Sequence, residues 1–238
     1  MPSKVAVITG ASRGIGRAVA LGLAEDGYHV VLLSRDQKAL NRVVKTIKNK
    51  NGKAKAFVLD VSNAAKVKSI ITDIKKKFKR IDVLFNNAGI LRKGSVDLAD
   101  DEMEKLIKIN LLGAMYVAKY VAAFMKKQKS GYIINLSSMS GQRGFPKLGC
   151  YTASKFGLVG FNQCLYKELI SYGIKVTSIC PSFVATDMAS QLDFPMKKMI
   201  QPKDIVETIR YLLNIGKNAA INNINIECSA FVEMQNER

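Results

Sequence analysis

The sequence has one histidine, no tryptophan and four cysteines in 238 residues. The cysteines, Cys150, Cys164, Cys180 and Cys228, are scattered without a C-x-x-C pair, so neither a disulfide framework nor a zinc site is indicated. We expect all four to be buried small hydrophobic residues. His29 opens an apolar segment and is typical of a partly buried strand residue. Chemistry that needs a histidine base or a cluster of histidine ligands has almost nothing to work with, and no metal site is expected.

Long hydrophobic runs are also missing. The apolar stretches, such as "VVLL", fall far short of the roughly 20 residues that span a bilayer. The first dozen residues run directly into strand-like sequence without the apolar core of a signal peptide. We therefore expect a cytoplasmic protein with no membrane partner.

Acidic residues are scarce, since 19 Asp and Glu oppose 37 Lys and Arg and give a formal charge of +18. The basic residues concentrate at 45–55 and 75–80, and such stretches can attract nucleic acid, anionic membrane or an acidic protein. Aromatic residues do not interleave with them, as a platform for stacking bases would require. We favour a solvated lysine-rich surface and no nucleic-acid partner.

Apolar segments rich in β-branched residues alternate with amphipathic helical ones. Continuous Val, Ile and Leu runs are typical of parallel strands covered by helices on both faces. The pattern predicts a doubly wound α/β fold of the Rossmann type, about seven strands in one domain over 1–238. The expected strands are 4–9, 29–34, 55–59, 81–86, 131–137, 175–181 and 224–228, and the expected helices lie near 15–26, 38–49, 64–77, 101–127, 152–172 and 203–214.

A glycine turn, "TGASRGIG", follows the first expected strand and opens the first helix. Glycines there let the backbone approach a pyrophosphate at the helix N-terminus, where free N–H groups favour an anion. The spacing G-x3-G-x-G differs from the common G-x-G-x-x-G fingerprint. Its place between strand and helix nevertheless predicts dinucleotide binding. The residues expected to contact the cofactor are Gly10, Ser12, Arg13, Gly14, Ile15 and Gly16.

The end of the second strand predicts which dinucleotide binds. An acidic residue there would bond the ribose hydroxyls of NAD, whereas arginine accommodates the 2′-phosphate of NADP. The segment reads Ser34-Arg35-Asp36, and Arg13 could approach the same phosphate from the other side. Guanidinium groups suit phosphate, so we expect NADPH; a shift of two residues would instead make Asp36 a ribose ligand for NAD.

The stretch "YTASK" at 151–155 places a phenol and an ammonium four residues apart. Any solvated helix supplies such neighbours, so the spacing alone does not establish a site. Of the eight tyrosines, however, only Tyr151 has lysine four positions on.

Taken together, "TGASRGIG", "NNAG" at 86–89, Asn110, the serine in "INLSSMSG" and "YTASK" resemble the short-chain dehydrogenase/reductase family over nearly the whole chain. The resemblance implies an active-site tetrad of Asn110, Ser138, Tyr151 and Lys155. It is strongest to the 3-oxoacyl-acyl-carrier-protein reductases of fatty acid biosynthesis. Further cofactor contacts that it implies are Asp60, Val61, Asn87, Ala88, Gly89, Pro181, Val184 and Thr186, together with Tyr151 and Lys155.

In the reaction that the resemblance implies, Tyr151 protonates the alkoxide that forms when hydride reaches a substrate carbonyl, and Ser138 holds the carbonyl oxygen. Lys155 also bonds the nicotinamide ribose, and Asn110 supports a proton-relay water. Tyrosine has a pKa near 10, and an ammonium about 5 Å away is worth about 3 kcal/mol at an effective dielectric near 20. We therefore expect Lys155 to lower the pKa of Tyr151.

Three features depart from the family pattern. Ser182 follows Pro181 where glycine is common, only 13 residues (189–201) separate "TDM" from the next helix signal, and the tail from 223 lacks the usual closing glycine pair. They predict a more open pocket and leave the usual C-terminal subunit contact in doubt. A homodimer or homotetramer is still expected, from the apolar positions of 111–127 and 152–172. Alternative functions are an alcohol, sugar or steroid dehydrogenase of the family, and a non-catalytic cofactor-sensing or nucleic-acid-binding protein.

Overall fold

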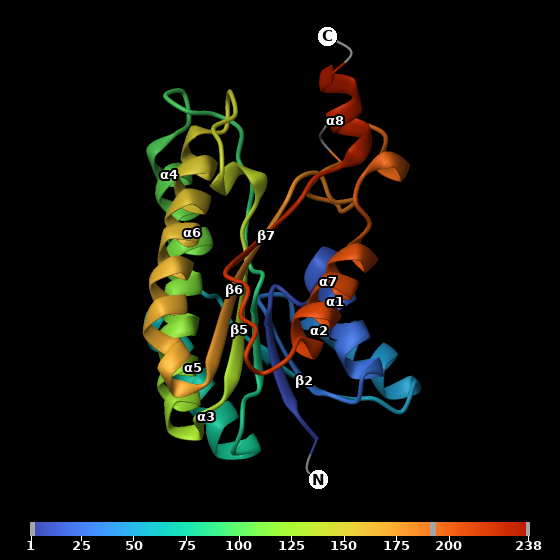
Figure 1. Cartoon of the computed structure of the whole chain (residues 1–238), viewed down its shortest axis with the longest axis vertical. Coiled ribbons are helices and arrows are strands. Elements are labelled where there is room, and N and C mark those ends of the chain that lie inside the picture. Colours follow the sequence, from blue (N-terminus) through green and yellow to red (C-terminus); the bar gives the residue numbers. More distant parts are fainter. Residues whose placement is uncertain (1–2, 191–193, 237–238) are drawn as a thin grey trace.

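The computed structural model describes residues 3–190 and 194–236, and these form one parallel β-sheet covered by helices on both faces (Figure 1). Within the described residues the sheet has seven strands in the order β3-β2-β1-β4-β5-β6-β7, and every neighbouring pair is parallel. The predicted doubly wound fold is confirmed. The strands are β1 Val5–Thr9, β2 His29–Ser34, β3 Lys53–Val58, β4 Val83–Asn86, β5 Gly131–Leu136, β6 Ile174–Pro181 and β7 Asn223–Ile226.

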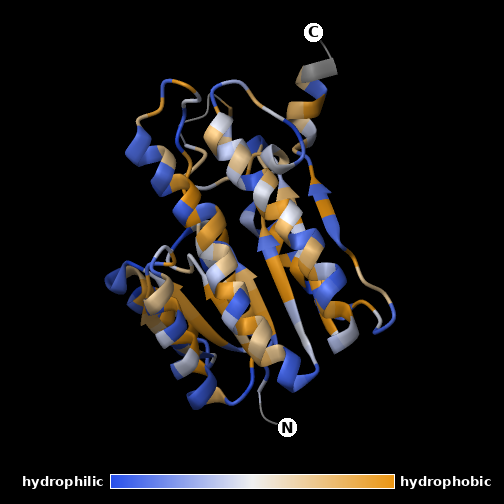
Figure 2. Cartoon of the chain, turned by 90° about the vertical axis from the view of Figure 1, so that its left-hand side faces the viewer, coloured by the Kyte–Doolittle hydropathy of each residue, from blue (hydrophilic) through white to orange (hydrophobic). Residues whose placement is uncertain are grey.

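The helices form two layers. One face of the sheet carries α1 Gly14–Glu25, α2 Gln37–Asn49 and α7 Pro202–Asn214, and the other carries α3 Ala64–Phe78, α5 Gly113–Gln128 and α6 Gly149–Leu169 (Figure 1). Figure 2 shows hydrophobic strands beneath helices that mix hydrophobic and hydrophilic residues, as amphipathic helices over a buried sheet do. Fully or almost fully buried side chains from the six helices are Leu23, Leu40, Ile209, Ile74, Val121 and Leu169.

The strand order reverses at β1. The chain passes from β1 to β2 and β3 on one side, then returns to place β4 on the other side of β1. At such a switch point the loops after the two central strands diverge and leave a crevice at the carboxyl ends of the strands. The fold therefore places the glycine turn after β1 beside the chain after β4.

The long helix expected at 101–127 is interrupted. It consists of α4 Asp100–Ile107, one π-helical turn over Lys108–Leu112 and α5. A π turn inserts an extra residue into the helical ladder and often marks a functional position. Here it contains Asn110, whose side chain is buried.

Within the described residues, one helical stretch, Asp100–Gln128, is long and apolar enough to cross a membrane by length and composition. Half of its most apolar window is buried inside the protein. Val117, Ala118 and Val121 of α5 are fully buried against the sheet and its neighbouring helices. The stretch is accounted for as a core helix.

Several element bounds differ from the predicted ones. β3 begins at Lys53, two residues before the predicted start at 55. The sequence pattern missed this start because the exposed Lys53 and Lys55 of this edge strand interrupt the apolar run. α6 begins at Gly149, so that Tyr151 lies in its first turn. A further helix, α8 Ser229–Asn236, follows β7 and was not predicted. The expectation for the cysteines was half wrong: Cys180 and Cys228 are buried, Cys150 is partly buried and Cys164 is exposed.

A buried series of hydrogen-bonded asparagine side chains joins β4, β5, α6 and the segment before β7. Asn86 of β4 donates to Asn135 of β5 at 3.0 Å, and Asn135 donates to Asn162 of α6 at 2.9 Å. Asn162 in turn donates to the backbone and side-chain oxygens of Asn222 before β7, both at 3.0 Å. Buried amides are costly unless paired, so this series fixes α6 against the carboxyl half of the sheet.

We predict that Asn135→Ala lowers the free energy of unfolding by about 2–4 kcal/mol, because Asn86 and Asn162 each lose a partner in a buried setting. Urea unfolding followed by circular dichroism measures it. Asn225→Ala, at an exposed position on β7, is the matched control and should change the value by less than about 0.5 kcal/mol. Equal effects of the two substitutions would contradict a structural role for the buried series.

Candidate active site

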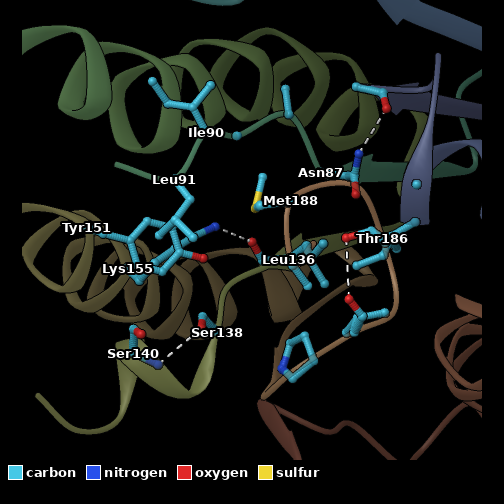
Figure 3. Close-up of a pocket in the computed structure, with 18 of the residues that line it drawn as sticks. Asn87, Ile90, Leu91, Leu136, Ser138, Ser140, Tyr151, Lys155, Thr186 and Met188 are labelled. Atoms are coloured by element: carbon cyan, nitrogen blue, oxygen red, sulfur yellow. Dashed lines mark hydrogen bonds between the residues drawn. The ribbon is translucent and has the colours of Figure 1, made fainter. Parts of the chain in front are cut away.

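A cavity of about 590 Å³ lies along the carboxyl ends of the strands, and most of the predicted site residues line it (Figure 3). Its size is typical of a small-molecule site. Among the described residues, no group of three or more His, Cys, Asp or Glu side chains is placed to hold a metal ion. The predicted residues that line the cavity are Gly10, Ser12, Arg13, Gly14, Ile15, Ser34, Arg35, Asp60, Val61, Asn87, Ala88, Gly89, Ser138, Tyr151, Lys155, Pro181, Val184 and Thr186.

The turn after β1 is locked to the chain after β4. The Thr9 hydroxyl accepts from the backbone N–H groups of Asn87 and Ala88 at 2.9 and 3.0 Å. The Asn87 amide donates to the carbonyls of Thr9 and Gly10 at 2.9 and 3.1 Å. Gly10 has φ of +64°, and a Cβ there would lie 2.7 Å from Asn87 Nδ2. No other residue fits at position 10 without moving this junction.

Gly16 was expected to contact the cofactor, but it does not line the cavity. A Cβ at Gly16 would lie 2.3 Å from the Gly10 carbonyl oxygen and 2.5 Å from Asn87 Nδ2. Its role is to let α1 begin directly against the turn. The N-terminus of α1 thereby faces the cavity, where its free N–H groups can receive an anion.

The far end of the cavity carries the residues expected to select the cofactor. The Ser34 hydroxyl donates to that of Ser12 at 3.0 Å. Asp36 does not line the cavity; its carboxylate accepts from Ala39 N at 2.8 Å and caps α2. The alternative in which Asp36 binds a ribose therefore lacks support, because its carboxylate is engaged elsewhere.

Both arginines at this end lie near carboxylates. Arg35 is 3.9 Å from Asp60, and Arg13 is 3.8 Å from Asp187 on the segment after β6. Burial of Asp60 would raise its pKa, but hydrogen bonds from Ser62 and the charge of Arg35 outweigh it and lower the pKa. Both ion pairs are largely exposed, so neither holds its guanidinium firmly.

Ser138, Tyr151 and Lys155 face one another across the middle of the cavity (Figure 3). The Lys155 ammonium donates to the Leu136 carbonyl at 2.9 Å and lies 5.7 Å from the centroid of the Tyr151 ring. The Ser138 side chain faces the Tyr151 phenol (Figure 3), and the interaction between them acts to lower the pKa of that phenol. The Ser138 hydroxyl also accepts from Ser140 N at 3.1 Å, which fixes the turn after β5.

The expected lowering of the Tyr151 pKa is not found. Burial raises the pKa of Tyr151 to about 12, and the interaction with Ser138 offsets only part of that rise. Burial likewise lowers the pKa of Lys155 to about 8. The one-turn spacing does bring the two groups together, but loss of solvent has a larger effect on the phenol than the ammonium does.

Asn110 does not line the cavity. Its side chain donates to the Ile90 carbonyl at 2.9 Å and accepts from Ile90 N at 2.8 Å. Its amide nitrogen also lies 3.3 Å from the Ser154 hydroxyl on α6. In this structure Asn110 is thus a positioning residue that ties the loop after β4 to the helix carrying Tyr151.

Several lining residues were not predicted. They follow β4, β5 and β6, so their positions after strand ends were a usable signal, except for Phe231 on the unpredicted α8. The more open pocket expected from the short segment 189–201 stays a prediction, because residues 191–193 of that segment lie outside the described residues. The unpredicted residues include the apolar Met139, Phe145, Phe183, Met188 and Phe231 and the basic Lys93, Arg143 and Lys147.

Comparison with known proteins identifies the family. The model of the short chain dehydrogenase family matches residues 4–196. A 3-oxoacyl-[acyl-carrier-protein] reductase from Synechocystis is 40% identical over 221 residues, covering 89% of this chain and 90% of the relative.

Two solved structures extend the comparison. The β-ketoacyl-[ACP] reductase FabG from Bacteroides thetaiotaomicron has a TM-score of 0.87 at 38% identity, covering 98% of this chain and all of that one. An actinorhodin polyketide ketoreductase, solved with NADPH, has a TM-score of 0.87 at 28% identity, covering 95% of this chain and 97% of its own. With these matches spanning nearly its whole length and the site geometry described above, the chain belongs to the short-chain dehydrogenase/reductase family of oxidoreductases.

Proposed function

We propose that this protein is an NADPH-dependent carbonyl reductase that reduces a 3-oxoacyl thioester carried on acyl carrier protein. The observation that carries the proposal is one cavity that joins two parts. At one end lies a glycine turn at a helix N-terminus, and in the middle Ser138, Tyr151 and Lys155 converge. A cofactor and a reacting carbonyl can therefore meet within one cavity.

The residues present fit a phosphorylated dinucleotide. Gly10 and Gly16 let the turn after β1 and the start of α1 pack directly against Asn87, which leaves the N-terminus of α1 facing the cavity for a pyrophosphate. Ser34 and Arg35, which line the same cavity, would contact a 2′-phosphate. Asp60, Val61, Asn87, Ala88 and Gly89 would line the adenosine side, and Pro181, Val184 and Thr186 the nicotinamide side. NADPH supplies the hydride; the protein supplies geometry and electrostatics. The structures solved with NADPH or NADP among its relatives support the same choice.

Ser138, Tyr151 and Lys155 would manage the proton. The raised pKa keeps the Tyr151 phenol protonated near neutral pH, which is the form needed to protonate an alkoxide. The Ser138 hydroxyl orients the carbonyl oxygen toward that phenol. With a pKa of about 8, Lys155 is mostly charged at pH 7, and its charge would favour transfer of the proton from the phenol as negative charge develops. The resting protonation state is therefore the one that reduction of a carbonyl requires.

Two observations support a carrier-bound acyl substrate. Two of the relatives named above are, by name, a 3-oxoacyl-[acyl-carrier-protein] reductase and a β-ketoacyl-[ACP] reductase. Lys93, Arg143 and Lys147 line the same cavity, and the chain carries a formal charge of +18, which suits an acidic carrier.

We further propose a homodimer or homotetramer in the cytoplasm. The exposed side of α6 presents Phe156, 45% exposed, with Gly160 in open space beside it on the same helix face. A partner subunit could pack closely over this apolar, small-residue surface.

Tyr151→Phe should lower kcat for reduction of acetoacetyl-CoA by NADPH at least 100-fold, because only the proton donor is lost. NADPH affinity, measured by nucleotide fluorescence, should stay within about twofold of the original. Tyr172→Phe, at an exposed position outside the cavity, is the control. Activity above a few per cent of the original in Tyr151→Phe would remove the phenol from its role.

Arg35→Ala should weaken NADPH binding about 10- to 150-fold. This loss corresponds to one charge-assisted contact with the 2′-phosphate, worth about 1.5–3 kcal/mol. NADH binding should change little, and Arg13→Ala should behave in the same way. The double change Ser34→Asp with Arg35→Ala should go further, since the new carboxylate repels phosphate and accepts bonds from ribose hydroxyls.

The measured quantity is the ratio of kcat/KM with the two cofactors. Lys38→Ala, an exposed basic residue outside the cavity, is the matched control for lost charge. An original enzyme that already prefers NADH, or a ratio that does not move, would refute the assignment of NADP.

A further inference from the structure

We infer that the C-terminal helix α8 forms one wall of the substrate end of the cavity. Phe231 on this helix determines specificity for an apolar acyl chain, and Ser182 holds the helix in position. The inference rests on the proposed reduction of a 3-oxoacyl group. It concerns the part of the cavity lined by Phe145, Phe183, Met188 and Phe231.

Ser182 anchors the start of α8 to the end of β6. Its hydroxyl accepts from Cys228 N at 2.7 Å, and its own N–H donates to the Ile226 carbonyl at 2.9 Å. The buried Cys228 thiol donates to the Lys198 carbonyl at 3.1 Å. Two of the three departures from the family pattern, Ser182 after Pro181 and the tail from 223, are thus in direct contact with each other.

Phe231 is held in place by other aromatic rings. Its ring packs edge-on against Phe183 at a centroid distance of 4.7 Å, and Phe194 lies 5.9 Å from Phe183 and 6.1 Å from Phe231. Phe183 and Phe231 line the cavity, whereas Phe194 does not and supports them from behind. Such edge-to-face packing fixes ring orientation, so the wall is preformed.

The opposite side of this end comes from the turn after β5 that begins at Ser138. Arg143 on that turn pairs with Glu227 just before α8 at 3.2 Å, and Gln142 bonds Asn223 of β7 at 3.4 Å. Arg143 also lies over the Phe145 ring. These contacts hold the turn that carries Ser138 and the tail that carries Phe231 on two sides of the same cavity. A carbonyl bound at Ser138 and Tyr151 can thus direct an attached apolar chain toward Phe231.

The test compares short and long chains on the full-length protein with NADPH. For Phe231→Ala, kcat/KM for 3-oxodecanoyl-CoA should fall about tenfold, mainly through KM, while that for acetoacetyl-CoA stays within about twofold. Ser182→Ala should shift the same ratio in the same direction, and Phe231→Leu should restore most of it. Val232→Ala, on the same helix but outside the cavity lining, should leave both values unchanged.

A second measurement needs no turnover. Calorimetric titration of the NADPH-loaded protein with the butyryl and decanoyl thioesters of N-acetylcysteamine should show tighter binding of the longer chain, and Phe231→Ala should abolish the difference. A wild-type protein that binds both chains equally, or a Phe231→Ala variant that loses activity equally with both substrates, would overturn the inference. Absence of reduction of any 3-oxoacyl substrate, with the chain-length preference in binding intact, would refute only the proposed reaction.

Discussion

The junction between the chain after β1 and the chain after β4 is the contact on which the cavity depends. Asn87 donates two hydrogen bonds to Thr9, from its backbone N–H to the hydroxyl and from its side-chain amide to the carbonyl, and Gly10 and Gly16 leave no room for a side chain beside them. Strand order reverses at this point, so the loops after β1 and β4 run in opposite directions and leave a crevice between them. The junction converts that crevice into a cradle with a helix N-terminus on one side. The proposed cofactor site is therefore a consequence of how the two halves of the sheet are joined.

Burial of Lys155 organises the reacting centre in a similar way. The side chain is only 5% exposed, and the Leu136 carbonyl satisfies its ammonium, while the Ser137 hydroxyl donates to the Lys155 carbonyl. These bonds fix α6 against β5. The same burial favours the uncharged form of each group, lowering the pKa of Lys155 to about 8 and raising the pKa of Tyr151 to about 12. Near pH 7 the phenol stays protonated and the ammonium stays mostly charged. One structural cause thus fixes both the positions and the protonation states.

Much of this could be predicted from sequence because the signals were local. Continuous Val, Ile and Leu runs identified the strands, and the glycine turn was recognisable from its place between β1 and α1. Features that depend on tertiary contacts could not be predicted. The pKa of Tyr151 depends on burial. The Asn110 side chain bonds Ile90 from within a π turn, and no residue type in the sequence indicates that turn. Helix α8 has no strong helical periodicity of its own and is defined by Ser182, a residue 47 positions before it in the chain.

The two ends of the cavity differ in how they are prepared for a ligand. At the end proposed to bind the adenosine side of the cofactor, Arg13 and Arg35 sit in exposed ion pairs with Asp187 and Asp60, and pairs of this kind contribute about 0–1 kcal/mol. Exchanging a carboxylate for a phosphate there costs little, while each new charge-assisted contact gains about 1.5–3 kcal/mol. Binding of the 2′-phosphate of NADPH would therefore require only the side chains of Arg13 and Arg35 to turn, with no change in the hydrophobic core. At the other end the aromatic rings already pack against one another, so an apolar chain would gain contact without ordering the wall that receives it.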